Sequence, residues 1–142
     1  MDRRSFIKKS SSFALASSCG ASLLVGCQTS PNIKTTLLKT QQNNKIIAHR
    51  TVLENDDFAI LHATTVKAPI FLHQQKNGKY VALLLSCTHQ KCTVSVTPDK
   101  LVCPCHGAKF DKQGTVLQGP ADKNLLALEL SEQGNEIIIS LP

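Results

Sequence analysis

Beyond residue 45, the apolar residues of this chain come in short runs between turn-forming residues. No run repeats at the helical spacing of three to four residues. The clearest pair, Pro69–His73 and Lys79–Leu85, encloses Asn77-Gly78, the strongest short signal for a β-hairpin. Turn sequences also separate three further pairs of predicted strands. The first pair is Thr93–Val96 with Leu101–Cys103, the second is Ala108–Phe110 with Thr115–Leu117, and the third is Leu125–Leu130 with Glu136–Leu141. The pattern therefore predicts an all-β, antiparallel and non-repetitive fold.

The first 45 residues are patterned differently. A weakly apolar stretch runs from Phe13 to Gly26, which is shorter than the roughly 20 residues that a membrane-spanning helix needs. Residues 28–45 are polar and rich in Thr, Gln and Asn, which predicts a tether. A strand over about 33–38 is the alternative for part of that tether. Residues 46–142 leave room for one domain.

Two short boxes of cysteine and histidine dominate the chemistry of this domain. The first reads Cys-Thr-His-Gln-Lys-Cys at 87–92, and the second reads Cys-Pro-Cys-His-Gly at 103–107. Two thiolates and two imidazoles can bind a metal centre, and the two remaining sulfurs can form a disulfide beside it. A tetrahedral zinc site would use the same four donors. Two structural disulfides are a further alternative, although they leave both histidines without a role.

The two boxes, followed by Gly119-Pro120-Ala121, resemble the Rieske iron–sulfur family in order and spacing. The resemblance implies a [2Fe–2S] cluster with Cys87 and Cys103 on one iron and His89 and His106 on the other. Because imidazoles are neutral where thiolates are anionic, such a centre accepts an electron more readily than an all-cysteine cluster does. The fold implied is a β-sandwich with a small inserted cluster-binding lobe at about residues 86–119.

The same resemblance assigns roles to the residues around the ligands. It implies a disulfide between Cys92 and Cys105 that ties the two cluster loops together, and this pair points to an oxidising compartment. Gly119, Pro120 and Ala121 are expected to form a loop that covers the cluster.

The sequence departs from the high-potential members of the family at two positions. Those members carry a serine and a tyrosine whose hydroxyl groups donate hydrogen bonds to cluster sulfurs, whereas this chain has Ala108 and Phe110. Hydrogen bonds to the sulfurs stabilise the added electron, so their loss is expected to lower the reduction potential. This difference weighs against quinol oxidation.

The N-terminal segment resembles an export signal. Arg3 and Arg4, followed by Phe6, look like a twin-arginine signal, which moves folded and cofactor-loaded proteins. The apolar stretch ends in Leu24-Val25-Gly26-Cys27, which resembles a lipoprotein processing site with Cys27 as the lipidated residue. We therefore expect a lipid-anchored protein on the periplasmic side of a bacterial membrane, with an uncleaved N-terminal anchor as the alternative.

The charge of the chain gives little support to nucleic-acid binding. The chain carries 16 Lys and Arg against 10 Asp and Glu, and removal of residues 1–27 would leave a net charge of +3. The sequence has no Trp and one Tyr, so it offers few rings for base stacking. Lys91, Lys109 and Lys112 lie in or beside the boxes. They are either ordinary solvated lysines or a basic rim that steers an acidic redox partner.

Three functions remain open on the sequence. The first is one-electron transfer, as a subunit or donor of a membrane-associated or periplasmic oxidoreductase whose partner is a cytochrome or another redox protein. In the second, the chain is the quinol-oxidising subunit of a cytochrome bc-type complex. The third is a zinc-stabilised binding module without redox activity. Whether the chain is an enzyme by itself is left open.

Overall fold

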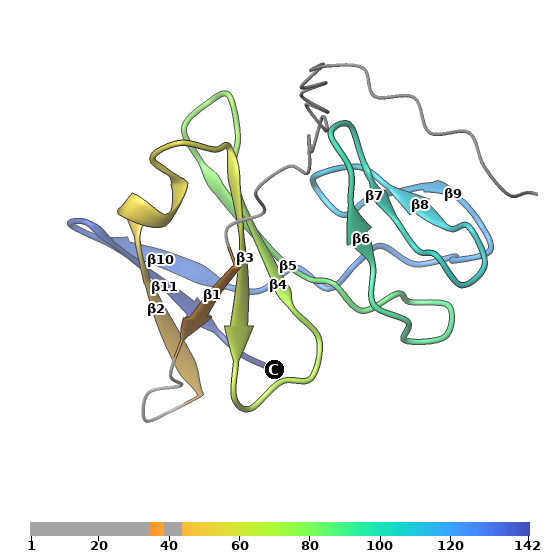
Figure 1. Ribbon diagram of the computed structural model, residues 1–142, viewed down its shortest axis with the longest axis horizontal. Helices are drawn as coiled ribbons and strands as arrows, with labels where there is room; N and C mark the ends of the chain where they lie inside the picture. The colour runs from red at the N-terminus through yellow and green to blue at the C-terminus, as the bar shows by residue number, and fades with distance from the viewer. Residues whose placement is uncertain (1–34, 39–43) are drawn as a thin grey trace, which may run out of the picture. The chain divides into compact units, whose positions relative to one another are not determined.

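The computed structural model describes residues 35–38 and 44–142 (Figure 1). Their strands form three sheets with the orders β1-β3-β4-β5, β10-β11-β2 and β6-β7-β8-β9. A single turn of 3-10 helix, η1 (Arg50–Leu53), follows β2. The strands are β1 (Thr35–Leu38), β2 (Lys45–His49), β3 (Phe58–Ala63), β4 (Ile70–Gln74), β5 (Tyr80–Leu84), β6 (Ser95–Val96), β7 (Leu101–Val102), β8 (Lys109–Phe110), β9 (Val116–Gln118), β10 (Leu130–Gln133) and β11 (Glu136–Ser140).

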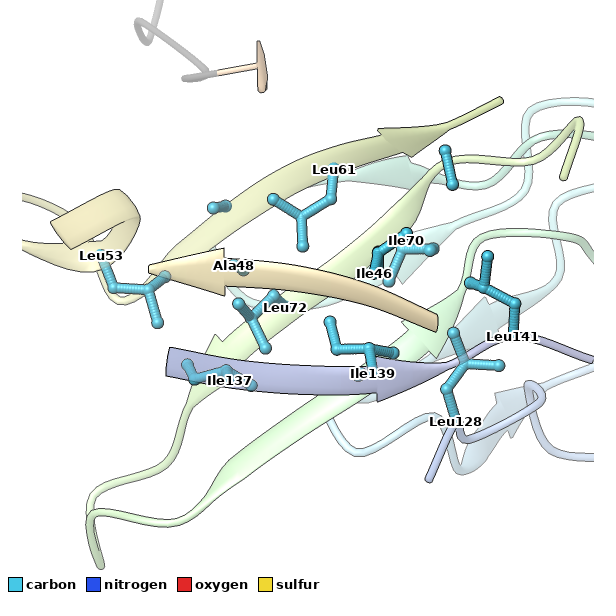
Figure 2. Close-up of a cluster of buried hydrophobic side chains, with 13 residues drawn as sticks. Ile46, Ala48, Leu53, Leu61, Ile70, Leu72, Leu128, Ile137, Ile139 and Leu141 are labelled. Atoms are coloured by element: carbon cyan, nitrogen blue, oxygen red, sulfur yellow. The ribbon is translucent and has the colours of Figure 1, made fainter. Parts of the chain in front are cut away.

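The first two sheets pack face to face as a β-sandwich. Side chains of β2 and β11 alternate between the core and the outside, so Ile46, Ile137 and Ile139 are fully buried (Figure 2). They meet Ile70 and Leu72 of β4 in one continuous apolar cluster. The predicted all-β sandwich is therefore confirmed.

The middle of the first sheet is buried on both faces. On β4, Ile70 and Leu72 face the sandwich core, whereas Phe71 belongs to a second core that includes Leu101 and Phe110 of the third sheet. Ala82 and Leu83 divide between the two cores in the same way on β5. Burial on both faces explains why these strands read as almost continuous apolar runs rather than as an alternation. The third sheet lies within residues 86–119, which we call the small lobe.

Beyond residue 45, the predicted hairpins agree with the structure except near the C-terminus. The Asn77-Gly78 hairpin joins β4 and β5 as predicted, with Gly78 in the left-handed region at a φ of 81°. The prediction of a strand from Leu125 was wrong, because β10 begins at Leu130. Leu125 and Leu128 are buried three residues apart, which does not fit the two-residue period of a strand. This segment instead makes an isolated bridge to β5 through Ala127.

β1 lies within the range that the sequence assigned to a polar tether. It pairs with β3 in parallel, from Thr35 opposite Ile60 to Leu38 opposite Ala63. The alternative of an added strand therefore describes these four residues, and this pair departs from the antiparallel pattern of the others. The export signal, Cys27 and the rest of the first 34 residues lie outside the described residues. Within the described part of the chain, no helix is long and apolar enough to cross a membrane.

Candidate metal centre

The two cysteine–histidine boxes form two loops with the same backbone hydrogen bonds. In the first box, the amide of Cys87 donates to the carbonyl of Cys92 (2.8 Å), and the amide of Lys91 donates to the carbonyl of Cys87 (2.8 Å). In the second box, Cys103 donates to Ala108 (2.8 Å), and Gly107 donates to Cys103 (3.0 Å). Counted from the first cysteine of each loop, the amide of residue one donates a hydrogen bond to the carbonyl of residue six. The amide of residue five donates to the carbonyl of residue one.

This shared geometry needs a left-handed residue at the fifth position of each loop. Gly107 adopts a φ of 77°, which costs a glycine nothing, and Lys91 adopts a φ of 61°. A residue with a Cβ in this region is disfavoured by roughly 1 kcal/mol or more. Lys91 therefore occupies a position that suits glycine better.

The loops bury two thiols and expose two imidazoles. Cys87 and Cys103 are each 1% exposed and take part in no disulfide. His89 and His106 are exposed, and their ring centroids lie 4.9 Å apart with the ring planes at 87°. Two soft sulfur donors inside and two imidazoles outside match the mixed ligand set of a Rieske-type [2Fe–2S] cluster. The structure therefore brings the two predicted cysteine donors close to each other, and the two predicted histidine donors close to each other.

The two buried thiols lie close to each other. Burial raises the pKa of the Cys87 thiol, and the neighbouring Cys103 thiol, within hydrogen-bonding reach, raises it further. The backbone amides of His89 and Gln90 point at the Cys87 sulfur and oppose that shift. Such amides favour a thiolate, and they would do the same for a thiolate bound to iron.

A disulfide joins the two loops beside the thiols. Cys92 and Cys105 are bonded, with their Cα atoms 6.5 Å apart. The Sγ atoms of Cys92, Cys103 and Cys105 all lie within 4.8 Å of one another. Because two of these sulfurs are in the disulfide, Cys103 is the member of this group that can donate a thiolate to a metal. The pairing implied by the family resemblance is thus present.

The segment that contains Gly119-Pro120-Ala121 is held against both loops. Before it, Gln118 Nε2 donates to the carbonyl of Gly107 in the second box (3.3 Å). After it, the Thr88 hydroxyl in the first box donates to the carbonyl of Lys123 (2.6 Å). Ala121 is buried, and the Gly119–Pro120 peptide bond is cis. The sequence predicted the covering loop but not these two hydrogen bonds, because they join residues 11 and 35 positions apart.

The two positions expected to tune the potential are both inside the lobe. Ala108 and Phe110 are fully buried and belong to the same apolar cluster as Cys87 and Cys103. Neither side chain carries a hydrogen-bond donor. The structure therefore surrounds the two thiols with apolar groups at these positions.

Comparisons with known proteins agree with this site. The family model for the Rieske [2Fe-2S] domain matches residues 42–131. The cytochrome b6-f complex iron-sulfur subunit 2 of Trichormus variabilis is 29% identical over 108 residues, which cover 73% of this chain and 61% of that protein. The Rieske subunit of the bovine mitochondrial cytochrome b-c1 complex is 30% identical over 99 residues, covering 67% of this chain and 36% of that subunit. The chain thus matches 36–61% of the length of these two relatives.

A solved structure shows the same fold. A chain of a hyperthermophilic respiratory complex III aligns with a TM-score of 0.54 at 22% identity, covering 68% of this chain and 74% of that one. The family model covers more than half of the sequence and includes both ligand boxes. The chain belongs to the Rieske [2Fe-2S] domain family, and its cofactor is a [2Fe–2S] cluster.

Proposed function

We propose that this chain transfers single electrons as a subunit or donor of a membrane-associated or periplasmic oxidoreductase. The observation that carries the proposal is the division of the site, with Cys87 and Cys103 buried and His89 and His106 exposed. A bound cluster supplies a centre that accepts one electron and gives it up again. The exposed histidine edges give a partner's redox group a short path to that centre.

The chain's own residues give the site its shape and keep water out. Cys87 and Cys103 would hold the inner iron, while His89 and His106 would hold the outer one. The Cys92–Cys105 disulfide fixes the distance between the two loops. Gln118 and Thr88 fasten the covering segment to one loop each. A site held in this way changes little in geometry when it is reduced, which favours fast electron transfer.

The second candidate is quinol oxidation within a cytochrome bc-type complex. It is supported by the similarity of this chain to two relatives that are subunits of cytochrome b6-f and b-c1 complexes. The apolar environment at Ala108 and Phe110 weighs against it, because no hydroxyl at these positions stabilises the added electron. We therefore favour a protein partner over quinol.

Protein-film voltammetry of the cluster-loaded chain beside the bovine subunit separates these candidates. We expect one reversible one-electron wave at a midpoint below that of the bovine subunit. A midpoint equal to or above the bovine value would favour quinol oxidation. Stoichiometric zinc without iron, after expression with cluster assembly intact, would instead support the non-redox zinc module.

We further propose that the protein is held on the periplasmic side of the membrane by lipid on Cys27. The proposal is supported by Arg3-Arg4, by the Leu-Val-Gly-Cys sequence at 24–27 and by a disulfide that needs an oxidising compartment. Replacing Cys27 by Ala should block lipid attachment and signal removal, and leave a larger precursor. A native N-terminus that retains Arg3-Arg4, found by mass spectrometry, would revive the uncleaved anchor.

A further inference from the structure

A cavity beside the first ligand box carries positive charge without acidic neighbours. It has a volume of about 430 Å³ and lies between the β3–β4 connection and the first box. Lys67 lines it from the connection, and Lys91 lines it from the box. Its other walls are hydroxyl-bearing or apolar, and no Asp or Glu lines it. Neither lysine forms an ion pair within the described residues.

A second cavity between the same two parts of the domain does not carry this excess of positive charge. This larger cavity, of about 690 Å³, also lies between the sandwich and the small lobe. Its lysines, Lys76 and Lys112, are matched there by Asp57, Asp99 and Asp111. The three aspartates outnumber the two lysines, so this cavity carries a small negative excess, whereas the cavity at Lys67 and Lys91 is cationic.

The backbone at Lys91 supplies an independent observation. The second box has glycine at the same left-handed position, and that glycine makes the same hydrogen bond as Lys91 does. A lysine there carries a conformational cost that glycine avoids. Conformational strain of this kind is characteristic of functional positions. Lys91 is exposed in the loop that also carries His89.

We propose that Lys67 and Lys91 form a socket for a carboxylate on the acidic surface of the redox partner. The inference rests on the proposed electron-transfer function and adds the chemical class of the partner. Because Lys91 lies two residues after His89, a carboxylate held there brings the partner's surface to the exposed edge of the cluster. Opposite charges also speed the encounter of two proteins before they make contact.

Charge reversal at Lys91 and at a distant lysine tests this proposal. The probe is ferricyanide, an anion that takes one electron from the reduced cluster and becomes ferrocyanide. At low ionic strength, Lys91→Glu should slow this reaction about tenfold, and high salt should abolish the difference. The matched control, Lys45→Glu, makes the same charge change on β2, in the sheet that faces away from the small lobe. It should slow the reaction less than about twofold.

An oxidant of opposite charge tests whether the change in reaction rate is electrostatic. A cationic oxidant, tris(phenanthroline)cobalt(III), should react faster with Lys91→Glu than with the unchanged protein. Equal effects of Lys91→Glu and Lys45→Glu on the ferricyanide reaction would overturn the proposal. Absence of a cluster signal in the unchanged protein would instead contradict the proposed electron-transfer function. Failure of the socket proposal can therefore be told apart from failure of the proposed function.

Two neutral variants separate charge from backbone strain. Lys91→Ala and Lys91→Gly both remove the ammonium group, but the glycine variant alone removes the left-handed strain. Both should slow the ferricyanide reaction equally, while Lys91→Gly unfolds at a higher temperature than Lys91→Ala. Different rates for the two variants would show that the effect is structural and would overturn the socket.

Cross-linking tests the class of partner directly. A carbodiimide should join a poly-glutamate peptide to Lys67 and Lys91 in preference to the exposed Lys45 and Lys76. Even labelling of all four lysines would contradict the socket. Protection of Lys67 and Lys91 by phosphatidylglycerol vesicles, without cross-linking to the peptide, would assign this face to a membrane and overturn the acidic protein partner.

Discussion

The sandwich and the small lobe are held together by different means. Sandwich strands β2 and β11 each run over five residues, and thirteen buried residues form the sandwich core. In the lobe, β6, β7 and β8 have two residues each. Such short strands cannot hold a sheet by themselves. The lobe relies on a disulfide, on loop hydrogen bonds and on apolar contacts with β4 and β5.

This difference separates the site from the scaffold that carries it. Because its apolar burial is broad, we expect the sandwich to stay folded without a cofactor and to support the lobe. The lobe in turn gives many of its residues to ligands and loops, and the core that it has depends on Phe71 and Leu83 of the sandwich. Damage to the lobe should therefore affect the cluster first, whereas damage to the sandwich should affect the whole domain.

Adjacent residues on β4 provide the largest test of this contrast. Phe71→Ala removes a ring from the core shared with the lobe, and Leu72→Ala removes a side chain from the sandwich core. We expect losses of about 3–5 and 2–5 kcal/mol respectively in the free energy of unfolding. In urea, visible absorbance of the cluster should be lost before far-ultraviolet dichroism in Phe71→Ala, and together with it in Leu72→Ala. Identical behaviour of the two variants would remove the distinction between the cores.

The disulfide should matter to the lobe and little to the sandwich. Replacing Cys92 and Cys105 together by Ser removes a link across 13 residues without leaving an unpaired thiol. The expected cost is up to about 3 kcal/mol. Cluster half-life, followed by absorbance, should shorten while the ligand set stays complete. A double variant that keeps its cluster as long as the unchanged protein would show that the loops need no covalent link.

Alanine substitutions at two glycines distinguish the cost of backbone strain from the cost of a steric clash between the lobe and the sandwich. Gly114 has a φ of 88°, and a Cβ built on it would lie 2.9 Å from Leu83 of β5. Gly78 has a φ of 81° and no atom within 4 Å of such a Cβ. Gly78→Ala should therefore cost about 1 kcal/mol, and Gly114→Ala about 1–3 kcal/mol more. Equal costs, measured by chemical unfolding, would mean that Leu83 moves aside freely.

The smallest expected effect is on the reduction potential. Ala108→Ser and Phe110→Tyr each place a hydroxyl group in the buried surroundings of the thiols. Each should raise the midpoint potential, and the double variant should raise it further, because hydrogen bonds to cluster sulfurs stabilise the added electron. Voltammetry that shows no upward shift in either variant would refute this explanation of the departure from the high-potential members.

Local patterns predicted much of this structure. Asn77-Gly78 located the β4–β5 hairpin, because turn chemistry depends on adjacent residues. The two boxes located both ligand loops for the same reason. β1 was expected within a tether, since its pairing depends on β3, more than twenty residues away. Neither the hydrophobic pattern of the sequence nor the strand propensity of its residues predicts such a long-range parallel pairing.

The surroundings of the site were harder to predict than its ligands. The hydrogen bonds of Thr88 and Gln118 depend on how the covering segment folds back over the loops. The sequence left Lys91 either as an ordinary solvated lysine or as part of a basic rim, and it showed neither its left-handed backbone nor the cavity that it shares with Lys67. Both features depend on tertiary structure. Sequence reasoning therefore predicted the donors, while the structure was needed to show what surrounds them.

The central claim is that Cys87, His89, Cys103 and His106 hold a [2Fe–2S] cluster. Pulsed electron paramagnetic resonance of the reduced protein, labelled with nitrogen-15 on histidine alone, tests it most directly. The account predicts a Rieske-type signal coupled to two histidine nitrogens, with one coupling lost in His89→Ser or in His106→Ser when the cluster is retained. A cluster signal without any histidine coupling, or couplings that persist unchanged in both variants, would contradict this ligand assignment.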